Sequence, residues 1–298
     1  MTIQQLLRSS IQRLKAAGID SPSLDAELLL ARALGAGRPF IIAHRDAAVA
    51  PGQAARFRAM LSRRARREPL AYITGEKEFY GYAFLVNRAV LIPRPETEFL
   101  VEAALDAVAG PDRHAGGSAG KSVIIDVGTG SGCVAVSVAK ELEKRSVGHR
   151  IYALDISARA LVVARRNIRR HNAGGNVTPV KSDLFAALPA AVRADAVVSN
   201  PPYVERAAID GLQPEIGRYE PRLALDGGDD GLDFYRKIVP AAKKRVKKNG
   251  ALILEIGDGQ ETGVSALLEE HGFIAARTVN DYSGVSRVIT ARLDDACR

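Results

Sequence analysis

Hydrophobic residues in the first 75 positions recur at helical spacing. The first run has an apolar side made of Ile3, Leu6, Leu7, Ile11 and Leu14, with Gly18 just beyond its end. Ser21 and Pro22 open a second predicted helix that stops at Gly35, and a third is expected from about residue 52 to 67. The pattern therefore predicts a small helical bundle over residues 1–75.

The pattern changes between residues 76 and 92, where aromatic and β-branched residues follow one another. Two apolar runs separated by Asn87-Arg88 predict a β-hairpin that turns near these two residues. We interpret 76–92 as a hairpin linker between the helical domain and a second domain, 93–298.

From residue 93 onward, apolar runs typical of buried strands alternate with segments of helical period, which predicts an α/β domain with a largely parallel sheet. The predicted strands are 122–127, 150–154, 177–181, 194–199, 251–256, 274–279 and 286–293. Helices are expected at about 98–108, 131–144, 157–171, 232–248 and 260–271. The Gly/Ala/Ser-rich stretch 110–120 and residues 204–231 are expected to be loops. The second is long and follows a strand directly, which favours a functional role.

Composition places the chain among ordinary globular proteins, with 47% hydrophobic and 26% charged residues in 298. No apolar run approaches the roughly 18 residues of a membrane span, and no signal-peptide core is present at the N-terminus. Cys133, Cys297 and the five histidines lack metal-ligand spacing. We therefore expect a cytoplasmic protein without a metal site.

The net charge of +8 is unevenly distributed. Residues 1–75 hold 12 Lys/Arg against 5 Asp/Glu, whereas the rest holds 30 against 29. The cluster Arg63, Arg64, Arg66 and Arg67 fits RNA, an acidic protein surface or a solvated helix face equally well. The near-neutral remainder argues against a basic nucleic-acid cleft in the α/β domain.

A glycine-rich turn follows the first strand of the α/β domain and opens a helix. It consists of Asp126, Val127, Gly128, Thr129, Gly130, Ser131 and Gly132. Glycines there let backbone N–H groups approach a ligand closely at the carboxyl edge of a parallel sheet. Asp155 ends the second strand, 23 residues after Gly132, where its carboxylate can accept hydrogen bonds from both ribose hydroxyls. Dinucleotide sites share this feature, so it does not discriminate between cofactors.

Three details favour S-adenosylmethionine over NAD. The glycine spacing is G-T-G-S-G rather than G-x-G-x-x-G. The Asp126 carboxylate suits an ammonium and a sulfonium, whereas it would repel a pyrophosphate. Ser182-Asp183 closes the third strand, where Asp183 can reach the adenine amine; capping a following helix is an alternative role for Asp183.

The fourth strand ends in Asn200-Pro201-Pro202-Tyr203. Asn200 through its side-chain oxygen and Pro201 through its carbonyl can accept both N–H groups of a planar amide, and the prolines hold these acceptors in place. Tyr203 would pack against the amide plane or form a wall of the sheet edge. The tetrapeptide can also serve only to terminate the strand. After a methyl-donor loop, the grip on an NH₂ group is the better interpretation.

With these motifs, the chain resembles the bacterial release-factor glutamine methyltransferases of the PrmC/HemK type over nearly its whole length. The shared segments are 24–29, 69–75, 78–81, 91–98, the glycine loop, 200–203, 220–225 and Gly227, Gly228, Asp230 and Gly231. Of these, Pro93-Arg94-Pro95-Glu96-Thr97-Glu98 is the most specific. The resemblance implies a class I methyltransferase fold, with a Rossmann-like, mostly parallel seven-stranded sheet and an N-terminal helical domain. It also implies action on the glutamine of the Gly-Gly-Gln loop of peptide chain release factors.

The resemblance also implies roles for single residues. The loop Gly128–Gly132 would line the methionine half of the cofactor and Asp155 would hold the ribose. Asn200 would touch both cofactor and substrate, and Pro201, Pro202 and Tyr203 would complete the glutamine site. Leu184 stands where some members have a tryptophan against the adenine, so it keeps apolar contact without ring stacking.

The segment containing Arg94, Glu96 and Thr97 is expected to wrap the methionine end of the cofactor or to act as a rigid linker. Glu255, at the end of the fifth strand, is interpreted as structural.

Three other functions compete. A ribosomal-protein glutamine methyltransferase would use the same amide grip, and an N6-adenine methyltransferase would apply it to a flipped base. A non-catalytic adaptor would bind RNA or the ribosome through the helical domain. The near-neutral α/β domain argues against the flipped base, and the intact motifs argue against the adaptor. Residues 220–225 resemble the release-factor branch of the family more than the ribosomal-protein branch. We expect a monomer that needs no nucleic acid for catalysis and no membrane.

Overall fold

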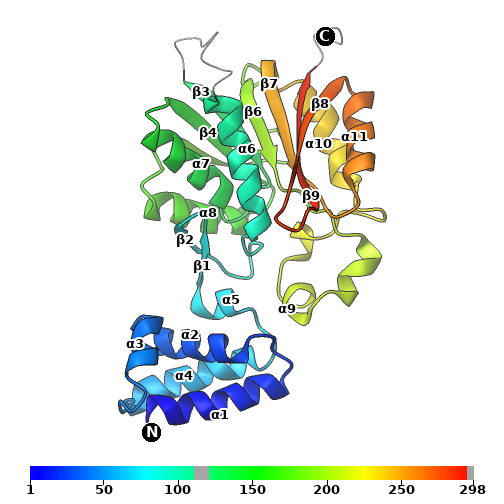
Figure 1. The fold of residues 1–298 in the computed structure, drawn as a ribbon. Coiled ribbons are helices and arrows are strands. Elements are labelled where there is room, and N and C mark those ends of the chain that lie inside the picture. Colours follow the sequence, from blue (N-terminus) through cyan, green and yellow to red (C-terminus); the bar gives the residue numbers. More distant parts are fainter. Residues whose placement is uncertain (111–120, 294–298) are drawn as a thin grey trace. The chain divides into compact units, whose positions relative to one another are not determined.

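The computed structural model describes residues 1–110 and 121–293. The predicted loop 110–120, apart from its first residue, and Cys297 lie outside the described residues. The chain divides into two compact units (Figure 1). Unit 1 comprises Met1–Glu76 together with Leu212–Tyr219, and unit 2 comprises Lys77–Gly211 and Glu220–Arg298. In the described parts of the chain, no helix is long and apolar enough to cross a membrane.

Unit 1 is helical, as predicted. Its helices are α1 Ile3–Ala16, α2 Pro22–Leu34, α3 Arg38–Ala43, α4 Pro51–Arg64, α5 Leu70–Thr74 and α9 Pro214–Gly217. Thr2 and Gln5 form a capping box at the start of α1, and Gly35 ends α2 in the left-handed conformation. Pro22 occupies the first turn of α2, but the Ser21 side chain makes no capping bond. The shorter α3 and α5 were missed because five or six residues show too little periodicity.

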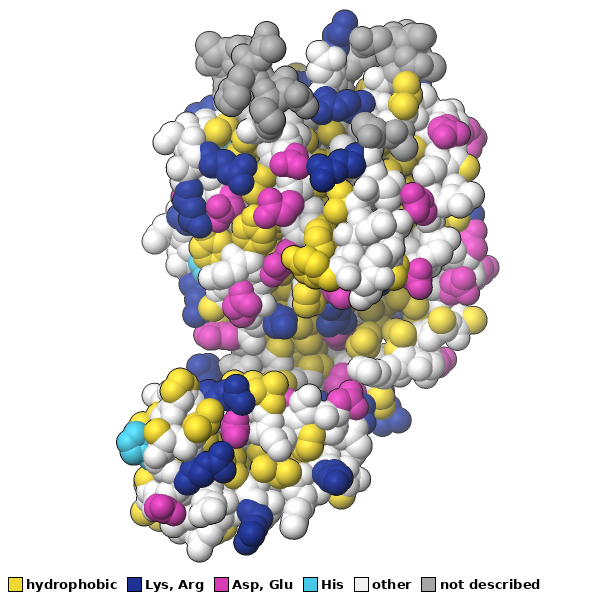
Figure 2. Space-filling model, viewed as in Figure 1, with side chains coloured by type: hydrophobic (Ala, Val, Ile, Leu, Met, Phe, Trp, Pro, Cys, Tyr) yellow, Lys and Arg dark blue, Asp and Glu magenta, His cyan; other side chains and the backbone are white. Residues whose placement is uncertain are grey.

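The arginine cluster of unit 1 is largely used within the unit. Arg64 is buried, and its guanidinium contacts Asp25 at 2.6 Å and Glu215 at 2.8 Å. Arg67 also binds Glu215, at 2.7 Å, and Arg63 pairs with a buried glutamate at 2.9 Å. Figure 2 shows Lys and Arg side chains of unit 1 scattered on the visible face rather than gathered in one patch. The cluster is therefore not the free basic surface that the sequence suggested; three of its four guanidiniums hold unit 1 together.

Replacing Arg64 by alanine is expected to destabilise unit 1 by about 3–5 kcal/mol, because Asp25 is left buried without its cation. Arg66→Ala is the matched control, since that side chain is exposed and a surface change costs within about 0.5 kcal/mol. Urea unfolding followed by far-ultraviolet circular dichroism measures both. Equal unfolding curves for the two variants would contradict the role assigned to Arg64.

Unit 2 is built on a seven-stranded sheet. Its strands are β3 Ser122–Val127, β4 His149–Asp155, β5 Val177–Lys181, β6 Ala194–Ser199, β7 Val246–Glu255, β8 Phe273–Asn280 and β9 Ser286–Leu293. The order is β5-β4-β3-β6-β7-β9-β8, with β9 antiparallel to both neighbours and the other pairs parallel. The predicted fold class, a mostly parallel α/β sheet with a helical N-terminal region, is confirmed.

The helices of unit 2 cover both faces of the sheet (Figure 1). They are α6 Glu98–Ala109, α7 Cys133–Lys144, α8 Ala158–Arg170, α10 Asp233–Lys243 and α11 Glu261–Glu270. One core cluster joins α6, α7 and α8 to one face, and a second joins α10 and α11 to the other. The predicted helix 232–248 extended too far. Lys247 belongs to β7, where it pairs with Asp195 of β6 at 2.8 Å, and its polar character hid the start of this strand.

The predicted β-hairpin is present, but its turn was misplaced. Strands β1 Glu76–Phe79 and β2 Tyr82–Leu85 meet at Tyr80-Gly81, not at Asn87-Arg88. Both turn residues have positive φ, 52° and 74°, as a two-residue hairpin turn requires. Asn87 starts a separate turn, in which its side-chain oxygen accepts the N–H of Ala89 at 2.9 Å.

The segment 204–231 is more ordered than the loop that was expected. It contains the 3₁₀ helices η3 Arg206–Gly211 and η4 Arg222–Ala224 in unit 2, and α9 in unit 1.

Candidate active site

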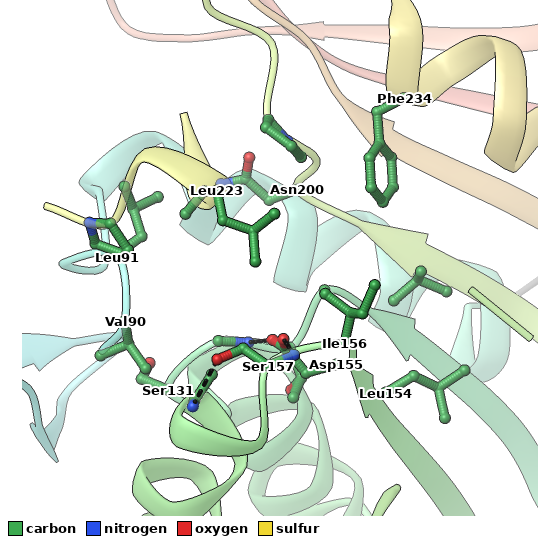
Figure 3. Close-up of a pocket in the computed structure, with 18 of the residues that line it drawn as sticks. Val90, Leu91, Ser131, Leu154, Asp155, Ile156, Ser157, Asn200, Leu223 and Phe234 are labelled. Atoms are coloured by element: carbon green, nitrogen blue, oxygen red, sulfur yellow. Dashed lines mark hydrogen bonds between the residues drawn. The ribbon is translucent and has the colours of Figure 1, made fainter. Parts of the chain in front are cut away.

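A pocket of about 680 Å³ lies in unit 2 at the carboxyl ends of β3, β4 and β6. This edge of a parallel sheet is where ligands of α/β proteins bind. In Figure 3, Asn200 and Leu223 lie on one side of the pocket, while Ser131, Asp155 and Ser157 lie on the opposite side. The structure therefore brings together the glycine loop and Asn200, although Asp126 and Asn200 are 74 residues apart in the chain.

The glycine loop forms one wall of this pocket. Gly128, Gly130 and Gly132 all have positive φ, so the turn needs residues without a Cβ. Asp126 is 2% exposed and its Oδ2 accepts the Thr129 hydroxyl at 2.6 Å. Burial, helped by the nearby Asp155 charge, raises the pKa of Asp126 to about 7. A buried carboxyl of this kind gains from a cationic ligand group that stabilises its ionised form.

Asp155 ties the ends of β4 and the glycine loop together. Its Oδ2 accepts the Gly130 N–H at 2.9 Å and its Oδ1 accepts the Ser157 N–H at 2.8 Å. Ser157 in turn caps α8 through the Ala160 N–H. Burial raises the pKa of Asp155. Both carboxylate oxygens are held in place, and each keeps a further lone pair for a ligand hydroxyl.

The third strand brings Asp183 and Leu184 into the pocket lining. Residues 183–187 form turns rather than a helix, and it is the Ser182 hydroxyl that accepts a backbone N–H, from Ala187 at 3.0 Å. The alternative role of Asp183 as a helix cap is therefore wrong. Leu184 has a φ of 45°, which is uncommon for a residue with a bulky side chain. Its aliphatic side chain lines the pocket.

Asn200 follows the end of β6 and lines the pocket. Ser199, the last residue of β6, is buried, and its hydroxyl donates a 2.8 Å hydrogen bond to the Val127 carbonyl, which fixes the end of the strand. The Asn200 Nδ2 donates to the Thr97 hydroxyl at 3.0 Å. Because this contact uses the amide nitrogen, Oδ1 is the atom left to accept from a substrate. The sequence left the role of Thr97 open, and in the structure its hydroxyl accepts this bond from Asn200.

Three of the predicted site residues are not part of the pocket lining: Gly132, Pro201 and Tyr203. Pro201 is buried, and the Tyr203 ring lies against Gly257 and the apolar core, where burial raises the pKa of Tyr203 to about 12. The geometry therefore favours a wall residue over direct contact with a planar amide. Pro202 does line the pocket.

Gly227 and Gly231 pack closely against the backbone of Tyr203, the last residue of the tetrapeptide. A Cβ on Gly227 would come within 2.8 Å of the Tyr203 backbone, and one on Gly231 within 2.5 Å of its carbonyl oxygen. The Gly227 N–H donates to the Val204 carbonyl at 2.8 Å. Only residues without side chains allow the two segments to approach this closely, which explains the glycines at these positions.

Sequence reasoning missed several apolar lining residues, namely Val90, Leu91, Ile156, Leu223 and Phe234 (Figure 3). Ile156 and Leu223 are 51% and 62% exposed, so both offer apolar surface for contact with a ligand in the pocket. Ile156 directly follows Asp155, a sequence position that could have identified it. Leu223 lies in the shared segment 220–225, for which the sequence suggested no role, and Phe234 carries no such signal.

A buried ion pair holds the segment before Thr97. The Arg94 guanidinium binds Glu220 at 2.6 Å, and the second Glu220 oxygen accepts the Ile92 N–H at 3.2 Å. Arg94 lines the pocket together with Thr97. Glu220, which belongs to the connection 204–231, thus anchors the segment 92–97.

The carboxylates that line the pocket suit a ligand that carries a positive charge and a ribose. Asp126, Asp155 and Asp183 all line the pocket, and their negative charge would repel an anionic pyrophosphate. Among the described residues, no cluster of His, Cys, Asp and Glu could hold a metal ion.

Comparisons with known proteins agree with this geometry. Residues 5–75 match the family model of the PrmC N-terminal domain, and residues 115–213 match that of the methyltransferase small domain. The chain is 41% identical over 292 residues to a release factor glutamine methyltransferase of Geobacter sulfurreducens, covering 98% of this chain and 97% of that one. A protein of the same name from Moorella thermoacetica is also 41% identical, covering 98% of both chains.

Among solved structures, the hMettl16 catalytic domain in complex with the MAT2A 3'UTR hairpin 6 has a TM-score of 0.56 at 15% identity, covering 83% of each chain. That similarity supports the fold alone. The identity to curated relatives over nearly the whole length supports more: the chain belongs to the family of release factor glutamine methyltransferases.

Proposed function

We propose that the protein transfers a methyl group from S-adenosylmethionine to the side-chain amide nitrogen (N5) of the glutamine in the Gly-Gly-Gln loop of peptide chain release factors. The observation that carries the proposal is the position of Asn200 across one pocket from the carboxylate-lined glycine loop. Curated relatives of the chain are named for this activity.

The cofactor fits the residues of the pocket. Asp126 would bind the ammonium group, Asp155 the ribose hydroxyls and Asp183 the adenine amine, with Ile156 and Leu184 as apolar walls. Leu184 offers no aromatic stacking, so adenine is held by apolar contact and hydrogen bonding. S-adenosylmethionine supplies the methyl group on an electrophilic sulfonium.

The protein then has to position and polarise a weakly nucleophilic amide. Asn200 Oδ1 would accept one N–H group of the substrate, and the Pro201 carbonyl, although Pro201 does not line the pocket of the free protein, would accept the other. Both bonds raise the electron density on the amide nitrogen. The same acceptors stabilise the positive charge that develops on nitrogen as the methyl group is transferred. The Pro201-Pro202 pair holds them in advance, and such alignment contributes roughly 7–11 kcal/mol to a bimolecular step. The proton leaves to solvent.

The test is incubation with labelled S-adenosylmethionine. The acceptors are purified release factor, a factor with the loop glutamine changed to alanine, ribosomal protein and undermethylated DNA. Label on the release factor alone, lost in the Gln→Ala factor, is expected. Label on DNA or ribosomal protein instead would favour the competing methyltransferases, and no label at all would favour the adaptor.

Unit 1 would supply a second contact with the folded release factor, which is much larger than one loop. A higher kcat/KM for the intact factor than for a loop peptide is expected from such a contact. Equal values would argue that the loop alone is recognised. We infer that the protein acts on this substrate in the cytoplasm, as a monomer and without nucleic acid.

A further inference from the structure

Glu255 is a buried carboxylic acid behind the candidate active site. It ends β7, is 1% exposed and does not line the pocket. Its side chain is hydrogen-bonded to Thr97, while its Oε2 has no hydrogen-bond partner among the described residues. Thr97 is itself 3% exposed and receives the Asn200 Nδ2 at 3.0 Å. A continuous chain of hydrogen bonds thus runs from Glu255 through Thr97 to Asn200.

We propose that Glu255 is a positioning residue that, through Thr97, sets which end of the Asn200 amide faces the substrate. The proposal rests on the proposed function only for its kinetic consequences; the orientation of Asn200 is a property of the free protein.

The ionisation state of Glu255 sets the direction of the hydrogen bonds in this chain. An ionised Glu255 can only accept, so the Thr97 hydroxyl must donate to it. The Thr97 oxygen then has lone pairs for the Asn200 NH₂, and Asn200 Oδ1 is left for the substrate. A protonated Glu255 can instead donate to Thr97, whose hydroxyl hydrogen is then free to bind Oδ1. In that state, Asn200 Oδ1 is bound to Thr97 and cannot accept from the substrate, and the Asn200 NH₂ group faces the substrate instead.

The surroundings of Glu255 bring its pKa close to neutral pH. Charged groups facing it are Glu96 and Arg94, next to Thr97, and Arg287 on β9. Tyr203, Tyr235 on α10 and Cys133 at the start of α7 complete the titratable groups around it. Burial raises the pKa of Glu255 to about 7, more than the arginines lower it. Because the ionised form is the productive one, kcat should rise as the pH increases through about 7.

Two kinetic variants test the chain of bonds. Thr97→Val removes the bridge and is expected to lower kcat by about tenfold or more, with little change in the KM for S-adenosylmethionine. Thr97→Ser keeps the hydroxyl and should stay within about threefold of wild type. Glu255→Gln cannot ionise, so its kcat should be low and independent of pH between 6 and 8. Thr178→Val, on the exposed face of β5, and Glu269→Gln, exposed on α11, are matched controls.

Saturating S-adenosylmethionine is needed in these assays, because Asp126 also has a pKa raised to about 7 and would otherwise add its own effect on cofactor binding.

A spectroscopic measurement separates this inference from the proposed function. The Asn200 side-chain NH₂ resonance, assigned by its loss in Asn200→Ala, should shift with pH near 7 in the free wild-type protein. The shift should be absent in Glu255→Gln and Thr97→Val. No titration of this resonance in wild type, or full kcat in Thr97→Val, would overturn the inference. If wild type titrates but fails to methylate release factor, the proposed function falls while the positioning role stands.

Discussion

Replacing Asn200 by alanine is expected to lower kcat for methyl transfer by about 10²–10³-fold, the usual cost of removing one preorganised group from a developing charge. The effect arises because Asn200 Oδ1 is the acceptor left free when Nδ2 binds Thr97. S-adenosylmethionine affinity should fall by less than about tenfold, since Asp126 and Asp155 keep their own anchors in the glycine loop. Single-turnover rates and cofactor titration measure the two effects separately.

Asn176→Ala is the matched control for this variant. Asn176 follows α8 and is not among the residues that line the pocket, and its side chain makes a long contact of 3.4 Å with Glu143. It should leave kcat unchanged. Unchanged turnover in Asn200→Ala would remove the amide grip from the mechanism.

Replacing Asp155 by alanine is expected to weaken S-adenosylmethionine binding at least about 100-fold. Two hydrogen bonds from ribose hydroxyls to a charged group contribute about 1.5–3 kcal/mol each, and each 1.4 kcal/mol is about tenfold in Kd. The variant also releases the Gly130 and Ser157 N–H groups that Asp155 now holds, so the glycine loop loses its attachment to β4.

Isothermal titration with S-adenosylhomocysteine measures this loss without turnover. Asp258→Ala, an exposed carboxylate outside the pocket lining, should bind as wild type does. A Kd for Asp155→Ala within about threefold of wild type would show that the ribose is held elsewhere. With saturating cofactor, kcat of this variant should recover more than that of Asn200→Ala, because Asp155 does not touch the substrate amide.

Much of the α/β domain was predictable because its signals are local. A buried parallel strand is a continuous apolar run, and a glycine turn is visible as soon as the strand before it is recognised. The seven strands and the positions of Asp126, Asp155 and Asn200 at strand ends follow from these runs. The errors also have local causes: Lys247 gave β7 a polar start, and the Tyr80-Gly81 turn lacks the usual Asn-Gly or Asp-Gly pair.

By itself, the sequence determined the kind of chemistry: a methyl-donor loop, a ribose carboxylate and an amide grip, each written within a few consecutive residues. Only the tertiary structure decided how these groups are held. In the structure, the Tyr203 ring packs against the apolar core, and Arg64 and Arg67 bind Glu215 on α9, which is remote in sequence. Thr97 connects Asn200 to Glu255. The reason is physical. A motif is set by backbone spacing along the chain, whereas burial, ion pairing and hydrogen-bond direction depend on side chains that meet only when remote segments pack together.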